Sequence, residues 1–221
     1  MGDVIWPKRV RISASPARLL GRVRSRSRAI SGAETLVPSL TSWWEVNLSV
    51  AVVEEDARLE WEAWLAGMRG GLATCAVPMH MSDRVGYLSR DGEAGQGVAE
   101  FTSHEHWIFD TSSEDRITLA QSAALRATDL PLDLGNAERP RPGHRLSIAD
   151  RMHRVALSWE TDGGAIMVRV DPPLRSAHSA GTPVDVDQIT CLMRLADEGE
   201  GEIEDVPGAV QRFTVRLVEA L

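Results

Sequence analysis

One amphipathic helix between two strand-like segments constrains the fold of this chain most strongly. Within residues 54–70, apolar side chains recur at helical spacing, at Ala57, Trp61, Trp64, Leu65 and Met68. Acidic residues in the first turn favour the positive end of the helix dipole, and Gly70-Gly71 predicts the stop. A helix with two tryptophans on one face needs a sheet to cover that face. We therefore expect these tryptophans to lie in a core rather than on a ligand platform.

The segment before this helix alternates at the period of a strand. Apolar side chains occupy every second position of Ser42–Val53, from Trp44 to Val52, which predicts a strand with one apolar face. Trp43 and Trp44 are adjacent, so their side chains point to opposite sides of that strand. Further strands are predicted over Leu72–Pro78, Ile189–Ala196 and Val210–Val218.

A tight turn late in the chain predicts a hairpin. Asp162-Gly163-Gly164 separates the apolar segments Val155–Trp159 and Ala165–Val170, and its residues tolerate positive φ. Asp171-Pro172-Pro173 ends the second strand, because proline cannot donate a hydrogen bond to a sheet. Residues 82–100 are rich in Gly, Asp and Glu and predict a loop.

Charge is distributed unevenly along the chain. The formal net charge of −8 argues against nucleic-acid specificity, and no apolar run is long enough to insert into a membrane. Residues 1–28 contain eight basic side chains against the single acid Asp3, whereas residues 197–205 contain six acids and no base. These two segments are expected to pair within one copy or across a subunit boundary. No secretory signal is predicted at the N-terminus, so synthesis in a cytoplasm is expected.

An alternation of arginines with small residues follows in the basic segment, at Arg22, Arg24, Arg26 and Arg28. On a regular strand this spacing places four guanidinium groups on one face. A solvated strand face and an anion-binding site are both compatible with the pattern.

His104-Glu105-His106 is the sharpest candidate for a metal site. On a strand both imidazoles would share one face, which suits zinc, and Asp110 or His80 is a candidate third ligand. A surface histidine pair without a metal is the alternative. A calcium loop built on Asp197, Glu200 and Glu202 lacks the twelve-residue EF-hand spacing.

No nucleophile, phosphate-binding or dinucleotide motif is present. Four polar residues lie near one another in sequence, His144, Ser147, Asp150 and His153, but sequence proximity does not define a catalytic triad. Cys75 and Cys191 lack a CxxC partner and are expected to be buried free thiols. We therefore assign no catalytic residue, no cofactor and no metal ligand, and do not expect an enzyme.

Several short motifs follow one another in a characteristic order. They are Arg22–Arg28 with Ser31-Gly32, Trp43-Trp44, Trp61-x-x-Trp64-Leu65-x-x-x-Arg69-Gly70, Gly143-His144, His153-Arg154-Val155, Val170–Arg175, Met193–Asp197 and Arg212–Val215. In this order they resemble the minor tail, or distal-tail-like, proteins of long-tailed (siphovirus-type) bacteriophages and gene-transfer-agent-like particles. The segment Cys75–Pro78 departs from the family pattern, in which an aromatic residue follows the helix.

The resemblance implies a mainly-β fold with one long helix. Residues 1–80 with 187–221 would form a tail-tube-like β-sandwich of two sheets flanked by helix 54–70, and residues 81–186 an inserted β-rich module. It also implies a structural virion protein at the tail tip that forms a ring, typically a hexamer. The implied partners are other copies of the chain and the tail tube, tail hub and fibre proteins.

Two other functions remain open at this point. The first is a carbohydrate- or receptor-binding β module that uses an exposed tryptophan, such as Trp43, Trp44 or Trp107. The second is a metal-dependent hydrolase built around His104 and His106. Fold alone does not decide among the three.

Overall fold

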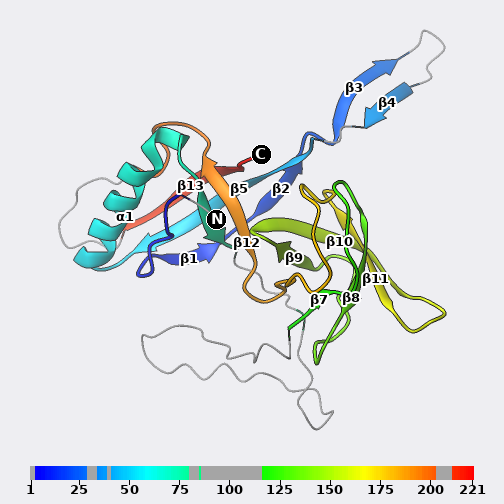
Figure 1. Ribbon diagram of the computed structural model, residues 1–221. Coiled ribbons are helices and arrows are strands. Elements are labelled where there is room, and N and C mark those ends of the chain that lie inside the picture. Colours follow the sequence, from blue (N-terminus) through cyan, green and yellow to red (C-terminus); the bar gives the residue numbers. More distant parts are fainter. Residues whose placement is uncertain (1–2, 29–33, 39–40, 80–84, 86–115, 203–210) are drawn as a thin grey trace. The chain divides into compact units, whose positions relative to one another are not determined.

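Two compact units make up the chain (Figure 1). The computed structural model describes residues 3–28, 34–38, 41–79, 85, 116–202 and 211–221. Unit 1 comprises residues 1–81 and 190–221, and unit 2 comprises residues 82–189. The two ends of the chain therefore build one unit, and the other unit is inserted between them. Strands account for 45% of the structure, so the predicted mainly-β fold with one long helix is confirmed.

A six-stranded antiparallel sheet forms the centre of unit 1. Its strands are β1 (Arg11–Ala14), β2 (Ala17–Leu20), β5 (Trp43–Val52), β6 (Cys75–Pro78), β12 (Thr190–Leu195) and β13 (Gln211–Glu219). The order is β1-β5-β13-β12-β6, and β2 also pairs with β5, alongside its N-terminal half. Because β5 and β13 pair along eight residues, a strand from the N-terminal part of the chain and the C-terminal strand lie side by side in the middle of the sheet.

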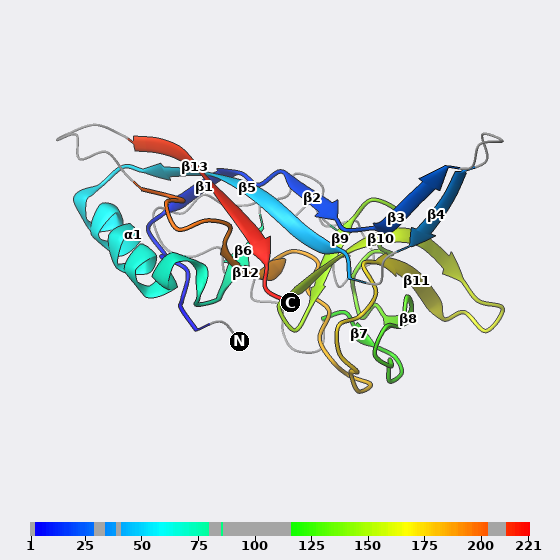
Figure 2. The same ribbon diagram turned by 90° about the horizontal axis from the view of Figure 1, so that it is seen from above.

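The helix α1 (Glu55–Met68) covers one face of this sheet (Figure 2). Its apolar stripe is buried as predicted, at Ala57, Trp61, Trp64 and Met68. The rings of Trp61 and Trp64 stack 4.7 Å apart, and Trp61 also packs 5.1 Å from Phe213 of β13. Trp6 closes the cluster with edge-on contacts to both helix tryptophans. A short 3-10 turn, η1 (Arg69–Gly71), ends the helix at the predicted glycine pair.

The arrangement of the sheets differs from the expected sandwich. Two sheets were expected around the helix in one unit, but the structure has a single large sheet there and the second large sheet in unit 2. The physical reason lies in the alternation along β5, where Glu45, Asn47 and Ser49 face away from the helix. These polar side chains suit a face turned to solvent, and they leave little apolar surface for a second sheet to bury there.

A separate two-stranded sheet pairs β3 (Val23–Arg28) with β4 (Glu34–Pro38). Its pairing register shifts between Val23 and Ser25. Such a shift is typical of a bulge, which adds one residue to one strand of a pair.

Unit 2 is built on a five-stranded antiparallel sheet. Its strands are β7 (Thr118–Leu119), β8 (Asp129–Asp133), β9 (Arg145–Ile148), β10 (Arg151–Glu160) and β11 (Ile166–Asp171), in the order β7-β8-β11-β10-β9. The predicted hairpin is β10 with β11, and the turn between them contains Gly164 at φ +79°.

The chain after β11 closes this sheet into a small barrel. Val184 N–H donates to the carbonyl of Ile117 beside β7, and Asp185 exchanges two backbone hydrogen bonds with Ser147 of β9. Residues 181–185 therefore lie between the two edge strands, which removes the open edges of the sheet. Branched aliphatic side chains fill the interior, including Leu130, Ile148 and Val168. Among the described residues, no helix is long and apolar enough to cross a membrane.

Candidate interaction surface

The candidate surface is the face of the unit 1 sheet that the helix leaves uncovered, which we call the open face. On β5 the even-numbered residues from Trp44 to Val52 are buried, and the odd-numbered residues between them are partly exposed. Directly paired residues of an antiparallel sheet share one face. The pairing register therefore identifies which side chains of the neighbouring strands lie on the open face.

Two rows of paired residues bring arginines onto the open face. One row runs from Arg18 of β2 through Glu45 and Val218 to Arg194 of β12. The other row places Arg11 of β1 and Arg212 of β13 on either side of Ala51. Adjacent strands lie about 4.8 Å apart, so the backbones of Arg11 and Arg212 are roughly 10 Å apart.

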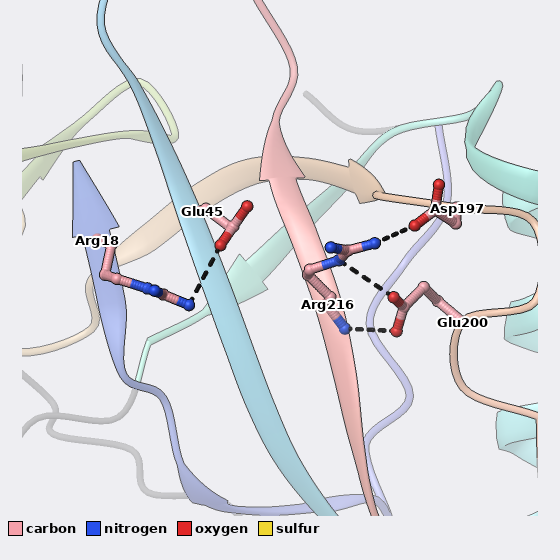
Figure 3. Close-up of polar contacts among 5 residues, drawn as sticks. All are labelled: Arg18, Glu45, Asp197, Glu200 and Arg216. Atoms are coloured by element: carbon pink, nitrogen blue, oxygen red, sulfur yellow. Dashed lines mark hydrogen bonds and ion pairs between the residues drawn. The ribbon is translucent and has the colours of Figure 1, made fainter. Parts of the chain in front are cut away.

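Arg216 of β13 lies between these rows and binds two carboxylates of the acidic segment (Figure 3). Its backbone N–H donates to Glu200 Oε2 at 2.9 Å and its Nε to Glu200 Oε1 at 3.2 Å, while Nη2 pairs with Asp197. Across the sheet, Arg18 Nη2 lies 3.4 Å from Glu45 Oε1 (Figure 3). The open face is thus already a surface on which arginines hold carboxylates.

The charge of the open face is opposite in sign to that of the chain. Five arginines lie on it, Arg11, Arg18, Arg194, Arg212 and Arg216. Three carboxylates, those of Glu45, Asp197 and Glu200, oppose them, which leaves 5 − 3 = 2 positive charges. The whole chain carries −8. Within the described part of the chain, Arg11 and Arg212 are exposed and form no ion pair.

The basic N-terminal segment and the acidic segment do not pair with each other through these contacts. Arg9 pairs instead with Asp56 of the helix, at 2.6 Å, and with Glu60 at 3.7 Å. The acidic segment uses Arg216, which belongs to the C-terminal strand. The ion pairs of Arg9 and Arg216 therefore do not join the two segments.

No metal site occurs in the described residues at the positions that the sequence suggested. His80, His104, Glu105, His106 and Asp110 lie outside them, as does Trp107. No group of three or more His, Cys, Asp or Glu side chains that could hold a metal occurs in the part that the structure describes. In the segment read as a possible calcium loop, Asp197 and Glu200 bind Arg216.

The polar residues near β9 and β10 do not form a triad. Ser147 pairs with Met152, so the next residue, His153, points to the opposite face of the sheet. His153 is 1% exposed, and its Nδ1–H donates to the carbonyl of Pro172 at 2.7 Å. Its Nε2 is buried without a hydrogen-bond partner among the described residues. Burial lowers the pKa of His153 to about 4, although the hydrogen bond to Pro172 opposes this shift.

Both cysteines of unit 1 and most of its tryptophans lie in its core. Trp44 is 1% exposed, whereas the adjacent Trp43 is half-buried on the open face. Cys75 and Cys191 are buried free thiols, as predicted. The Sγ of Cys75 accepts the indole N–H of Trp64 at 3.5 Å.

Arg11, Arg194, Arg212 and Arg216 were not singled out by the sequence analysis as interacting residues. The available signal was their position opposite the apolar residues of predicted strands, as for Arg216 between Val215 and Leu217. That signal shows a polar face without showing which strands lie side by side.

Comparisons with known proteins identify no family for this chain. The sequence matches no model of a known protein family, and no curated protein matches it.

Proposed function

We propose that this protein is a structural virion protein of a phage tail tip, which forms a ring that joins the tail tube to the hub or fibres. The order of short motifs along the chain supports the proposal, since it resembles that of minor tail and distal-tail-like proteins. The proposal includes self-association, and contacts with tail tube, hub and fibre proteins.

The observation that carries the proposal is that three of those motifs meet in unit 1. The Trp43-Trp44 strand and the closing strand are sequence-distant but pair at the centre of one sheet. The Trp61–Trp64 helix packs on that sheet through Phe213 of the closing strand. These three motifs therefore contribute to one core, as the parts of a common scaffold would.

Purified protein and assembled particles together test the proposed function. Native mass spectrometry and negative-stain electron microscopy of the purified chain are expected to show a ring of identical copies. Antibody labelling of tailed particles is expected to mark the tail tip. A chain that stays monomeric at every concentration reached and is missing from purified particles would contradict the proposal.

The alternative, a carbohydrate- or receptor-binding module, is favoured by one observation in unit 2. Trp159 and Arg169 lie on the outside of the β10–β11 hairpin, with the guanidinium carbon 5.7 Å from the ring centroid. Asp129 binds Arg169 through two hydrogen bonds, of 2.6 and 2.8 Å, and this contact lowers the pKa of Asp129. Leu157 beside them is 50% exposed. A flat aromatic ring next to polar groups is a common arrangement for sugar binding.

Glycan binding by the purified chain decides on this alternative. If it holds, Trp159→Ala abolishes binding, whereas Leu125→Ala, at a 57% exposed position of the same unit, leaves binding unchanged. A chain that binds none of a broad panel of glycans would remove the alternative.

A further inference from the structure

Within the described residues, three arginines of the open face form no ion pair, Arg11, Arg194 and Arg212, and the pairing register brings Arg11 and Arg212 close to each other. Arg11 and Arg212 flank Ala51, whose side chain is a single methyl group. Thr214 and Ser49, the next pair along β13 and β5, place hydroxyl groups beside them. Two guanidinium groups next to hydroxyl donors form a surface suited to carboxylates.

The contacts of Arg216 on the same face indicate which kind of segment this face binds. Arg216 lies four residues beyond Arg212 on the same strand, and it binds Asp197 and Glu200 of an irregular acidic segment. Arg216 also offers its backbone N–H to Glu200, because β12 no longer pairs with β13 at this point. The open face therefore already binds carboxylates carried on a loop, in its own chain.

Two further carboxylates of the acidic segment do not bind Arg216. Glu198 and Glu202 are exposed and form no ion pair within the described residues. The segment between them is held in place, since the Gly201 carbonyl accepts the Trp61 indole N–H at 2.8 Å and Gly201 is buried. The stem of Glu198 lies near Gly70, where an added Cβ would come within 3.1 Å of Glu198 Cγ. A segment that is already ordered loses little conformational entropy when it binds.

We propose that the open face of one copy, through Arg11 and Arg212, binds the acidic segment 197–202 of a second copy, through Glu198 and Glu202. This inference rests on the proposed function, because it names the contact by which copies of the ring would join. The two patches differ, so the contact is head-to-tail and repeats from copy to copy until a ring closes. Exposed ion pairs contribute little affinity, and their role here is to set partner, orientation and register.

A nucleic acid is the other polyanion that such arginines could bind. The net charge of −8 argues against it, since binding a phosphate backbone requires several uncompensated cations, and two positive charges remain on this face. The choice of an acidic protein segment follows from the charge of the chain and from the contacts of Arg216.

Charge-reversal variants test the contact. One variant carries Arg11→Glu with Arg212→Glu, and a second carries Glu198→Arg with Glu202→Arg. Each is expected to associate with itself at least roughly tenfold more weakly than the wild type, because like charges then face each other. Mixed in equal amounts, the two are expected to co-assemble into alternating assemblies larger than a dimer in native mass spectra. The acidic segment of the first meets the intact face of the second, and the reversed segment of the second meets the reversed face of the first. The chain with all four changes is expected to recover assembly.

A matched control separates this contact from general charge effects. Arg126→Glu with Arg141→Glu reverses two exposed arginines of unit 2 and is expected to assemble as the wild type does. Circular dichroism checks that every variant is folded.

Three results would overturn the inference. In the first, the Arg11→Glu, Arg212→Glu chain assembles normally; rings still form, so the proposed function stands while this contact is wrong. In the second, the four-fold variant fails to recover assembly although it is folded. In the third, the open face binds an oligothymidylate probe through Arg11 and Arg212, while charge reversal at both residues leaves assembly unchanged. A wild type that never assembles and is missing from particles would instead remove the proposed function.

Discussion

Trp61 donates its indole N–H to the carbonyl oxygen of Gly201 at 2.8 Å, which joins helix α1 to the acidic segment after β12. Gly201 adopts φ +83°, and a Cβ there would lie 3.0 Å from the Trp61 ring and 3.1 Å from Val215. The backbone approaches the tryptophan closely because this residue has no side chain. The contact positions both Glu200, which binds Arg216, and Glu202, which stays exposed.

Gly201→Ala is expected to destabilise the protein by roughly 1–3 kcal/mol, from left-handed backbone strain and from crowding against Trp61. Gly199→Ala is the matched control, because a Cβ at that position meets nothing within 4 Å. Urea unfolding followed by tryptophan fluorescence measures both. Equal midpoints for the two variants would show that the Trp61–Gly201 approach does not constrain the segment.

Glu219 is a buried acceptor at the end of β13. It is 2% exposed, and its Oε2 accepts the backbone N–H of Trp44 at 3.1 Å. Glu219→Ala is expected to cost about 1–3 kcal/mol, because it removes an acceptor from a buried N–H. Glu219→Gln keeps one side-chain oxygen and is expected to cost less. Thermal unfolding of the two variants compares them, and a larger loss for glutamine than for alanine would contradict the role of the hydrogen bond.

His153 is expected to make the stability of unit 2 fall in acid. Its pKa is about 4 in the folded chain, against an ordinary value of 6.5. Above pH 6.5 the imidazole is neutral in both the folded and the unfolded chain, and it adds no pH dependence. As pH falls from 6.5 toward 4, the unfolded chain binds a proton that the folded chain does not. The free energy of unfolding therefore decreases, by roughly 3 kcal/mol in full.

The variant His153→Leu removes this titration, so its free energy of unfolding is expected to depend less on pH between 6.5 and 4. Met152→Ala, at the neighbouring buried position, is the control and is expected to lower stability without changing the slope. Urea unfolding at a series of pH values, followed by circular dichroism, measures the slopes. An unchanged slope in His153→Leu would show that other groups cause the acid sensitivity.

Gly21 and Trp43 are expected to be energetically coupled. Gly21 adopts φ +69°, and a Cβ there would lie 2.3 Å from Cζ3 of the Trp43 ring. Gly21→Ala therefore combines backbone strain with a clash, and is expected to cost about 2–4 kcal/mol. In a Trp43→Ala background the ring is gone, and the cost is expected to fall to about 1–2 kcal/mol. Additive effects in this double-mutant cycle would argue against the contact.

Local periodicity accounts for the parts of the fold that could be predicted. The stripe that contains Trp61 and Trp64 specified the helix and its buried face, and alternation in Ser42–Val53 specified β5 within one residue at each end. The turn at Asp162-Gly163-Gly164 specified the β10–β11 hairpin. These features depend on neighbours within a few residues, so the sequence contains the whole signal.

The pairing register of the strands and the closure of the unit 2 sheet could not be predicted, because both depend on contacts between residues far apart in the sequence. Alternation is the same for a strand in a sandwich and for a strand in a one-sided sheet, so the predicted second sheet of unit 1 was not distinguishable from the open face. The closure of unit 2 depends on residues 181–185, which have no strand-like alternation and pair through single bridges. A bulge in β3 likewise changes register without a local signal of its own.

The chain by itself therefore determined one helix with a buried tryptophan stripe, several one-sided strands, and an acidic total charge with a basic N-terminal segment. Only the tertiary structure decided that Arg11 and Arg212, from opposite ends of the chain, lie on either side of Ala51. The reason is physical: helix and strand periods arise from local backbone geometry, whereas the neighbours of a side chain across a sheet are set by which strands pair and in which register.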